Sequence, residues 1–235
     1  MKNKILIFSA TYNEAENIQN FLKAIDELDL NVDILLIDDN SPDNTKKIIN
    51  DYKNNKEHIN LIVRDKKKGL DTAHKFAYEY CMKSNYSILI TLDSDMSHDP
   101  FIIPIFLNEL KRNVFVTGSR YMPGGSSDMT GWRFVLSYFG NKLIKFLLKI
   151  DCSEFTTSYR GFNIAELKDF NLNSVNSKGY SFFMETIYLL NKKKFYIKEI
   201  PIDFKNREKG KSKIAKIEMF RTLYNVFRLK FKGNT

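Results

Sequence analysis

The chain of 235 residues contains only two cysteines, Cys81 and Cys152. Because no short spacing pairs them, they indicate neither a disulfide framework nor a zinc site, and such usage is typical of the reducing cytoplasm. The chain also lacks any run of about 20 apolar residues, so we do not expect it to anchor itself by crossing a bilayer. No signal peptide is apparent, because Met1 leads almost directly into a short strand-like run at 5–8.

Two glycine-rich phosphate-binding patterns are absent as well. Neither G-x-G-x-x-G nor G-x-x-x-x-G-K-[ST] occurs, which excludes a dinucleotide fingerprint and a P-loop. Acidic residues are scarce in the second half: residues 1–120 carry 16 Lys and Arg against 18 Asp and Glu, whereas residues 121–235 carry 21 against 10. The basic half indicates an anionic partner, namely phosphate groups, a lipid surface or nucleic acid. An ordinary lysine-rich composition is the alternative.

The first 120 residues alternate short apolar runs with helical patterns. Helical spacing of apolar residues follows Asn13-Glu14, Pro42 and Pro100, and another helix is expected around residues 73–80. The strand-like runs lie at 4–8, 33–37, 59–63, 86–92 and 114–117. This alternation, with continuous apolar strands, predicts an α/β fold: a mostly parallel, Rossmann-like sheet flanked by helices on both faces.

Polar residues follow several of these runs, where the carboxyl ends of parallel strands meet at one edge of the sheet. Ligands of such sheets bind at that edge. The polar segments are Thr11-Tyr12-Asn13-Glu14, Asp38-Asp39-Asn40-Ser41, Arg64-Asp65 and Asp93-Ser94-Asp95. Their convergence predicts a nucleotide or metal site.

The Asp93-Ser94-Asp95 triplet is the clearest metal candidate. Its two carboxylates lie at the end of an apolar run, where the backbone turns and both can reach one ion. Oxygen ligands of this kind suit Mg²⁺ or Mn²⁺, which commonly bridge carboxylates to substrate phosphates. Such a cation neutralises a diphosphate leaving group. Taken alone, the triplet is equally consistent with an acidic turn that caps the helix at Pro100.

The second half of the chain has a different pattern. We expect an apolar, basic helix over 132–150, irregular and strand-like pieces up to Phe204, a basic loop at 206–213 and a final amphipathic helix at 214–231. Helices that combine apolar and basic side chains are typical of a membrane interface. Docking of their apolar sides onto the globular core is the alternative.

Eight segments, taken in order, resemble the family 2 glycosyltransferases and more narrowly the dolichyl- and polyprenyl-phosphate mannose synthases. They lie at 10–14, 37–43, 68–73, 91–100, 118–121, 177–180, 199–204 and 207–213. The resemblance implies a GT-A fold with a catalytic domain over 1–212, which includes a membrane-interface helix near 132–150. Residues 213–235 would then form a C-terminal basic amphipathic helix.

The resemblance also implies roles for individual residues. Metal ligands would be Asp93, Asp95 and Ser97, and catalytic residues would be Asp93, Asp95, Arg120 and Arg207. The nucleotide-sugar site would comprise Ala10, Tyr12, Glu14, Ile37, Asp39, Ser94, Asp95, Ser97, Arg120, Arg207 and Lys213. Two positions depart from the family pattern: Ala10 replaces a usual Pro, and Asp71 replaces a usual Gly, where an extra carboxylate bears on donor choice or loop closure.

The implied reaction is an inverting, metal-dependent transfer of a sugar, with mannose from GDP-mannose favoured, to polyprenyl or dolichyl phosphate. A lipid phosphate is already anionic, so it needs positioning and charge neutralisation instead of a general base; Glu185 is the nearest candidate if a base is used. The enzyme would be peripheral on the cytoplasmic face of a membrane, and a membrane-anchoring partner subunit is left open.

Two other classes of function remain at this point. One is a UDP-glucose- or UDP-GlcNAc-dependent transferase of surface-polysaccharide assembly, because no residue pattern identifies the base or the sugar. The other is a non-catalytic basic protein that binds lipid or nucleic acid. Nucleic acid is disfavoured, because no recognised module is present and the acidic edge of the sheet would repel a phosphate backbone.

Overall fold

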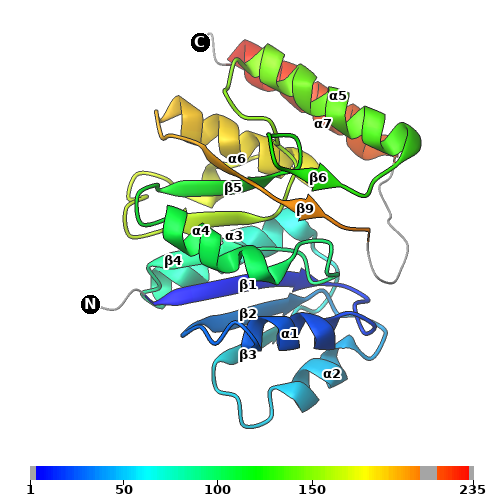
Figure 1. Ribbon diagram of the computed structural model, residues 1–235, viewed down its shortest axis with the longest axis vertical. Helices are drawn as coiled ribbons and strands as arrows, with labels where there is room; N and C mark the ends of the chain where they lie inside the picture. Colours follow the sequence, from blue (N-terminus) through cyan, green and yellow to red (C-terminus); the bar gives the residue numbers. More distant parts are fainter. Residues whose placement is uncertain (1–3, 207–215, 233–235) are drawn as a thin grey trace.

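The computed structural model describes residues 4–206 and 216–232, and a seven-stranded sheet runs through it (Figure 1). The strand order is β3-β2-β1-β4-β7-β5-β8, and all neighbours pair in parallel except β7, which is antiparallel to β4 and β5. The strands are β1 (Ile5–Thr11), β2 (Asp33–Asp38), β3 (Ile59–Val63), β4 (Ile88–Thr91), β5 (Phe115–Ser119), β7 (Arg160–Asn163) and β8 (Lys198–Pro201). The predicted mostly parallel sheet is confirmed, and each of the five apolar runs overlaps a strand.

Side chains that alternate along β1 enter two separate cores. Leu6 and Phe8 join one core with α3 (Leu70–Lys83), whereas Ile7 joins the other with α1 (Ile18–Asp26) and α4 (Ile103–Glu109). Helices on both faces explain why the strands read as continuous apolar runs. Both faces are therefore covered, and the polar segments that follow β1, β2 and β4 lie at the carboxyl edge of the sheet.

Two predicted helix starts differ slightly from the structure. Pro42 does not open a helix; α2 (Thr45–Tyr52) begins three residues later, because the Asp43 carboxylate accepts from the Thr45 amide at 3.0 Å and holds a turn there. Pro100 instead begins a short 3-10 turn, η1 (Pro100–Ile102), that leads into α4. Both prolines lie at positions where the backbone amide would not donate a helical hydrogen bond, so the missing N–H costs nothing.

Helix α6 (Tyr180–Lys192) is a clear difference from the expectation of irregular and strand-like pieces in this region. Its first two turns are buried on nearly every side, from Ser181 to Ile187. A helix buried all round shows no polar stripe, so the helical period disappears from the sequence. Tertiary packing decides the conformation here.

Helices α5 (Gly131–Leu148) and α7 (Lys216–Lys232) lie together at one end of the molecule, with α7 packed against α5 and α6 (Figure 1). Both helices are confirmed, although residues 214 and 215 lie outside the described part. A two-stranded ribbon of β6 (Ser126–Ser127) and β9 (Asp203–Phe204) adjoins them. Within the described residues, none of the helices is long and apolar enough to cross a membrane.

Candidate active site

A cavity of about 1130 Å³ opens at the carboxyl edge of the sheet. Part of its lining comes from the segments that follow β1, β2 and β4, and this part is polar and acidic. Another part comes from α5 and α7 and is apolar, with Trp132, Phe139, Leu143, Leu223 and Val226 among its residues. One cavity thus joins a charged region to an apolar one.

Most of the predicted site residues meet in this cavity. Ile37 is an exception, since it is buried within β2 and does not line the cavity, and Arg207 and Lys213 lie outside the described residues. The predicted residues that line the cavity are Ala10, Tyr12, Glu14, Asp39, Asp93, Ser94, Asp95, Ser97 and Arg120. The topology therefore brings together residues that are up to 110 positions apart, from 10 to 120.

The turn after β2 is fixed by Asp38, which is fully buried. Its carboxylate accepts from the Thr11 hydroxyl at 2.9 Å and from the Ser41 amide at 2.8 Å. The next residue, Asp39, lines the cavity and forms a buried ion pair with Arg64. Asp39 also accepts from the Gly69 amide at 3.4 Å, which ties it to the loop before α3. Arg64, which the sequence-based site did not include, thus orients a predicted nucleoside residue.

Tyr12 lies under an exposed cation in the same region. The Lys67 ammonium sits 4.0 Å from the centre of the Tyr12 ring, and both residues line the cavity. Such a contact is attractive because the ring face carries negative charge. A flat aromatic ring beside a cation provides a surface on which a nucleobase can stack.

The two carboxylates of the triplet differ in exposure. The Asp93 side chain is 37% exposed, whereas Asp95 is 3% exposed. Asp95 Oδ1 accepts from the Ser97 amide at 3.1 Å and from the Ser97 hydroxyl at 2.5 Å. Asp93 Oδ1 accepts from the Ser158 hydroxyl at 2.7 Å. Met96, between Asp95 and Ser97, has a left-handed backbone (φ 63°), which lets the chain reverse. Both carboxylates are therefore held in fixed orientations at one cavity.

His98 is buried beside the triplet. Burial lowers the pKa of its imidazole, so the ring is neutral at neutral pH. Because Nδ1 accepts from the Asp93 amide at 3.2 Å, the proton belongs on Nε2, which lies 3.4 Å from the Thr157 hydroxyl. The rings of Tyr159 and Phe204 pack against it. His98 thus supports the backbone of the triplet.

The donor set fits a divalent cation that is completed by substrate. Among the residues described, no group of three or more His, Cys, Asp or Glu side chains could hold a metal alone. Mg²⁺, however, is usually held by one or two carboxylates together with substrate phosphates and water. Asp93 and Asp95 supply two such carboxylates at one cavity. Ser97, the third predicted ligand, donates its hydroxyl to Asp95 in this structure.

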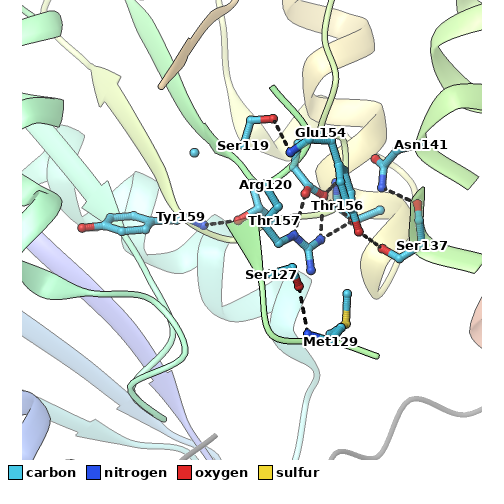
Figure 2. A network of polar contacts seen from close by, with 12 residues as sticks. Ser119, Arg120, Ser127, Met129, Ser137, Asn141, Glu154, Thr156, Thr157 and Tyr159 are labelled. Carbon is cyan, nitrogen blue, oxygen red and sulfur yellow. Dashed lines mark hydrogen bonds and ion pairs between the residues drawn. The ribbon is translucent and has the colours of Figure 1, made fainter. Parts of the chain in front are cut away.

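Arg120 forms a buried ion pair with Glu154 (Figure 2). The guanidinium donates from Nε to Oε2 at 2.7 Å and from Nη2 to Oε1 at 2.8 Å, and the two side chains are 8% and 0% exposed. Burial alone would lower the pKa of Arg120, but the Glu154 carboxylate holds it above the ordinary value. Burial would likewise raise the pKa of Glu154, and Arg120 keeps it low.

Glu154 is a residue that sequence reasoning missed. It lies 34 positions from Arg120, in an irregular segment without periodicity, so nothing in the sequence pairs the two. The predicted role of Arg120 as a phosphate-binding group remains a prediction. The structure adds that its charge is already matched inside the protein.

Glu185, the candidate for a general base, does not line the cavity. Its carboxylate accepts from the Ser177 amide at 2.7 Å and from Arg228 of α7 at 2.8 Å. This geometry makes it an anchor for α7 on α6.

A polar stripe on α5 was also missed. Arg133, Ser137 and Asn141 line the cavity at spacings of four residues, within an otherwise apolar helix. Ser137 accepts from the Tyr121 hydroxyl at 2.7 Å. Arg133 lies over the Trp132 ring, and it makes no ion pair with any other described residue. The sequence does not show which side of this helix faces a cavity, so the stripe is recognisable only in the folded structure.

Comparison with known proteins places the chain among sugar-transferring enzymes. A sequence profile of the family described as "Glycosyl transferase family 2" matches residues 7–169. The chain is 30% identical to the polyprenol monophosphomannose synthase of Mycolicibacterium smegmatis, over 98% of this chain and 88% of that protein. It is 28% identical to the undecaprenyl-phosphate mannosyltransferase of Micrococcus luteus, over 96% and 93%.

Solved structures share the fold. The glucosyl-3-phosphoglycerate synthase of Mycobacterium tuberculosis, solved with UDP, superposes with a TM-score of 0.71 at 13% identity, covering 97% of this chain and 80% of that one. A mannosyltransferase of Pyrobaculum calidifontis, solved with GDP-Man and Mn²⁺, gives a TM-score of 0.57 at 14% identity, covering 90% and 59%. The predicted GT-A fold is confirmed.

Proposed function

This chain belongs to glycosyl transferase family 2, and we propose that it transfers mannose from GDP-mannose, with inversion, to a polyprenyl or dolichyl phosphate. Both curated relatives carry names of mannosyl transfer to such lipids. The observation that carries the proposal is the cavity, which joins carboxylates at the sheet edge to an apolar region between α5 and α7. A nucleotide sugar and a lipid phosphate need these two environments side by side.

The donor occupies the sheet edge in this proposal. Tyr12 and Asp39 line the part nearest β1 and β2, where the nucleoside binds. Asp93 and Asp95 would hold Mg²⁺ or Mn²⁺, and the bound cation would supply neutralisation of the diphosphate leaving group. Ser158 and Ser97 orient these two carboxylates by hydrogen bonds of 2.7 and 2.5 Å.

The acceptor phosphate binds along α5. Arg133 offers a cation with no ion-pair partner among the described residues, and it lines the cavity with Ser137. A guanidinium matches phosphate oxygens in a bidentate manner and stays charged at any working pH. Because the lipid phosphate is already a nucleophile, it needs orientation and charge neutralisation, and no carboxylate has to remove a proton. In-line displacement at the anomeric carbon then inverts the configuration.

The lipid chain leaves the cavity toward a membrane. Large apolar side chains of α5 stay exposed, including Trp132 at 63%, Phe139 at 60% and Phe146 at 76%. On α7, Tyr224 and Phe231 are 69% and 66% exposed. With Lys142 and Lys145 beside them, these residues suit an interface in which rings enter the acyl boundary and cations meet anionic headgroups. We place the protein on the cytoplasmic face, with α7 as part of this interface; the remaining residues of the expected segment 213–235 lie outside the described part of the chain.

The test is a donor-by-acceptor screen with Mg²⁺ and Mn²⁺. We expect release of GDP from GDP-mannose only when polyprenyl phosphate is present, and an inverted anomeric product. Asp95→Ala should lower the rate of transfer at least about a hundredfold, since it removes a proposed metal ligand. Asp99→Ala is the matched control: the Asp99 carboxylate accepts from the Phe101 amide in the same segment, its backbone contacts survive the change, and Asp99 does not line the cavity.

Three results would argue against the proposal. Transfer from UDP-glucose or UDP-GlcNAc but not from GDP-mannose would show that the proposed donor is wrong. Full turnover by Asp95→Ala would remove the metal assignment. A retained anomeric configuration would exclude in-line displacement.

A further inference from the structure

The exposed carboxylate of the triplet depends on a residue from a distant loop. Ser158 is 4% exposed and donates its hydroxyl to Asp93 Oδ1 at 2.7 Å. The Ser158 carbonyl in turn accepts from the Thr91 hydroxyl of β4 at 2.5 Å. A hydrogen bond to one oxygen fixes the rotation of a carboxylate and so decides where its other oxygen lies. Ser158 therefore sets the orientation of Asp93.

The same loop is tied to helix α5 at its other end. Asn141 of α5 accepts from the Phe155 amide at 2.7 Å and donates to the Ser137 carbonyl at 2.9 Å. Asn141 is 2% exposed, and together with Ile144 it forms the buried part of α5. Asn141 thus joins the buried side of α5 directly to the loop.

Three further groups hold the loop of residues 153–158 between these two ends. Arg120 clamps Glu154, and Ser137 and Asn141 lie beside this pair (Figure 2). Glu199 accepts from the Ser153 amide at 2.9 Å and from the Glu154 amide at 3.1 Å. Arg160, 1% exposed, donates to the carbonyls of Phe155 and Thr157 at 3.1 and 2.9 Å. A segment held at so many points moves as one piece.

We propose that the 153–158 loop couples the seating of α5 to the metal and donor site, with Asn141 and Ser158 as positioning residues. The inference rests on the proposed function, because it takes Asp93 as a ligand of the donor's cation. A shift of α5, on a membrane or around an acceptor, changes the position of Phe155 through Asn141. The loop carries that change to Ser158, and Ser158 to the Asp93 carboxylate. Neither positioning residue touches the metal itself.

The experiment measures Mn²⁺ affinity by calorimetry in the presence of GDP, and of UDP in parallel. We expect Ser158→Ala and Asn141→Ala each to weaken Mn²⁺ binding about tenfold, the usual effect of losing an outer-shell partner. The Mn²⁺ affinity of the double variant should be nearly the same as that of the more affected single variant, because both changes break the same connection. Asn163→Ala is the matched control: this buried asparagine of β7 donates to the Leu110 carbonyl at 3.2 Å and does not line the cavity.

A second readout comes from the only tryptophan, Trp132, which lies on α5 and is 63% exposed. Coupling is reciprocal, so Mn²⁺ with GDP should shift Trp132 emission in the wild type and leave it unchanged in Ser158→Ala at saturating Mn²⁺. Unchanged Mn²⁺ affinity in Ser158→Ala or Asn141→Ala, or equal weakening in Asn163→Ala, would overturn this inference and leave the proposed function standing. A wild type that binds no Mn²⁺ with either nucleotide would instead overturn the proposed function.

Discussion

Replacing Glu154 with Gln tests whether the buried ion pair with Arg120 holds the active-site loop. The variant keeps the shape of the side chain but leaves the Arg120 guanidinium, 8% exposed, without a counter-charge. Removing one partner of a buried pair costs about 3–5 kcal/mol. Because Gln keeps an oxygen that can accept from Arg120, we expect a loss at the lower end of this range, about 3 kcal/mol. For a chain of this length, that loss lowers the melting temperature by about 6–12 °C.

Thermal and urea unfolding followed by circular dichroism would measure the change. The control is the double variant R120M/E154L, in which neither charge remains; it should recover most of the stability, because an apolar pair of similar volume often replaces a buried ion pair without loss. A loss below about 1 kcal/mol in E154Q, the level of an exposed pair, would refute the argument.

The same pair predicts a pH dependence of stability. Because Arg120 keeps the pKa of Glu154 low in the folded protein, the carboxylate stabilises the fold fully above its unfolded pKa of about 4.3. This contribution is lost as the pH falls through the lowered folded pKa. The rise in unfolding free energy between acid and neutral pH should therefore be smaller in E154Q than in the wild type; an equal rise would contradict the assignment.

The remaining predictions concern the two C-terminal helices. Changing Phe139 and Phe146 of α5 to Glu should weaken binding to anionic vesicles by at least tenfold in a co-sedimentation assay, since burial of each ring is worth about 1.5–3 kcal/mol. Phe76→Glu, a change at another exposed phenylalanine, is the control. Equal weakening in this control would exclude α5 as the face that binds the membrane. Arg228→Leu should lower the free energy of unfolding by about 1.5–3 kcal/mol, because it leaves the buried Glu185 carboxylate without its cation. Urea unfolding would check this, and a change within error would mean that the Arg228–Glu185 pair does not stabilise the packing of α7 on α6.

The fold could be predicted from the sequence where one period dominates. The apolar runs of β1 to β5 are short and bounded, and the helices between them show a polar side, so strand and helix separate clearly. Helix α6 could not be recognised, because Phe182, Phe183, Met184, Glu185 and Thr186 are consecutive and all buried. Burial on every side removes the contrast on which periodicity depends.

The candidate site divides in the same way. Residues that follow a strand within a few positions, such as Asp39 and Asp95, were identifiable because such residues gather at the carboxyl edge of the sheet. Glu154 and Ser158 were not, since their role comes from contacts with Arg120 and Asp93 across 34 and 65 positions in an irregular loop. The sequence does not indicate how far the residues of such a loop lie from Arg120 and Asp93 in space, because only tertiary packing brings the loop to the cavity.

The internal pairing of Arg120 changes how the charges of the site are assigned. A guanidinium that is already bound at two points by Glu154 adds little net positive charge at the cavity, because the pair is neutral as a unit. Within the described residues, the cations that line the cavity without a carboxylate partner are Lys67, over the Tyr12 ring, and Arg133 of α5. Loss of activity in an Arg120 variant would therefore report on the shape of the 153–158 loop as well as on phosphate binding. R120M/E154L separates the two, because it restores the packing without restoring the guanidinium: recovered transfer in that variant would assign Arg120 to the loop, and stable but inactive protein would assign it to the phosphates.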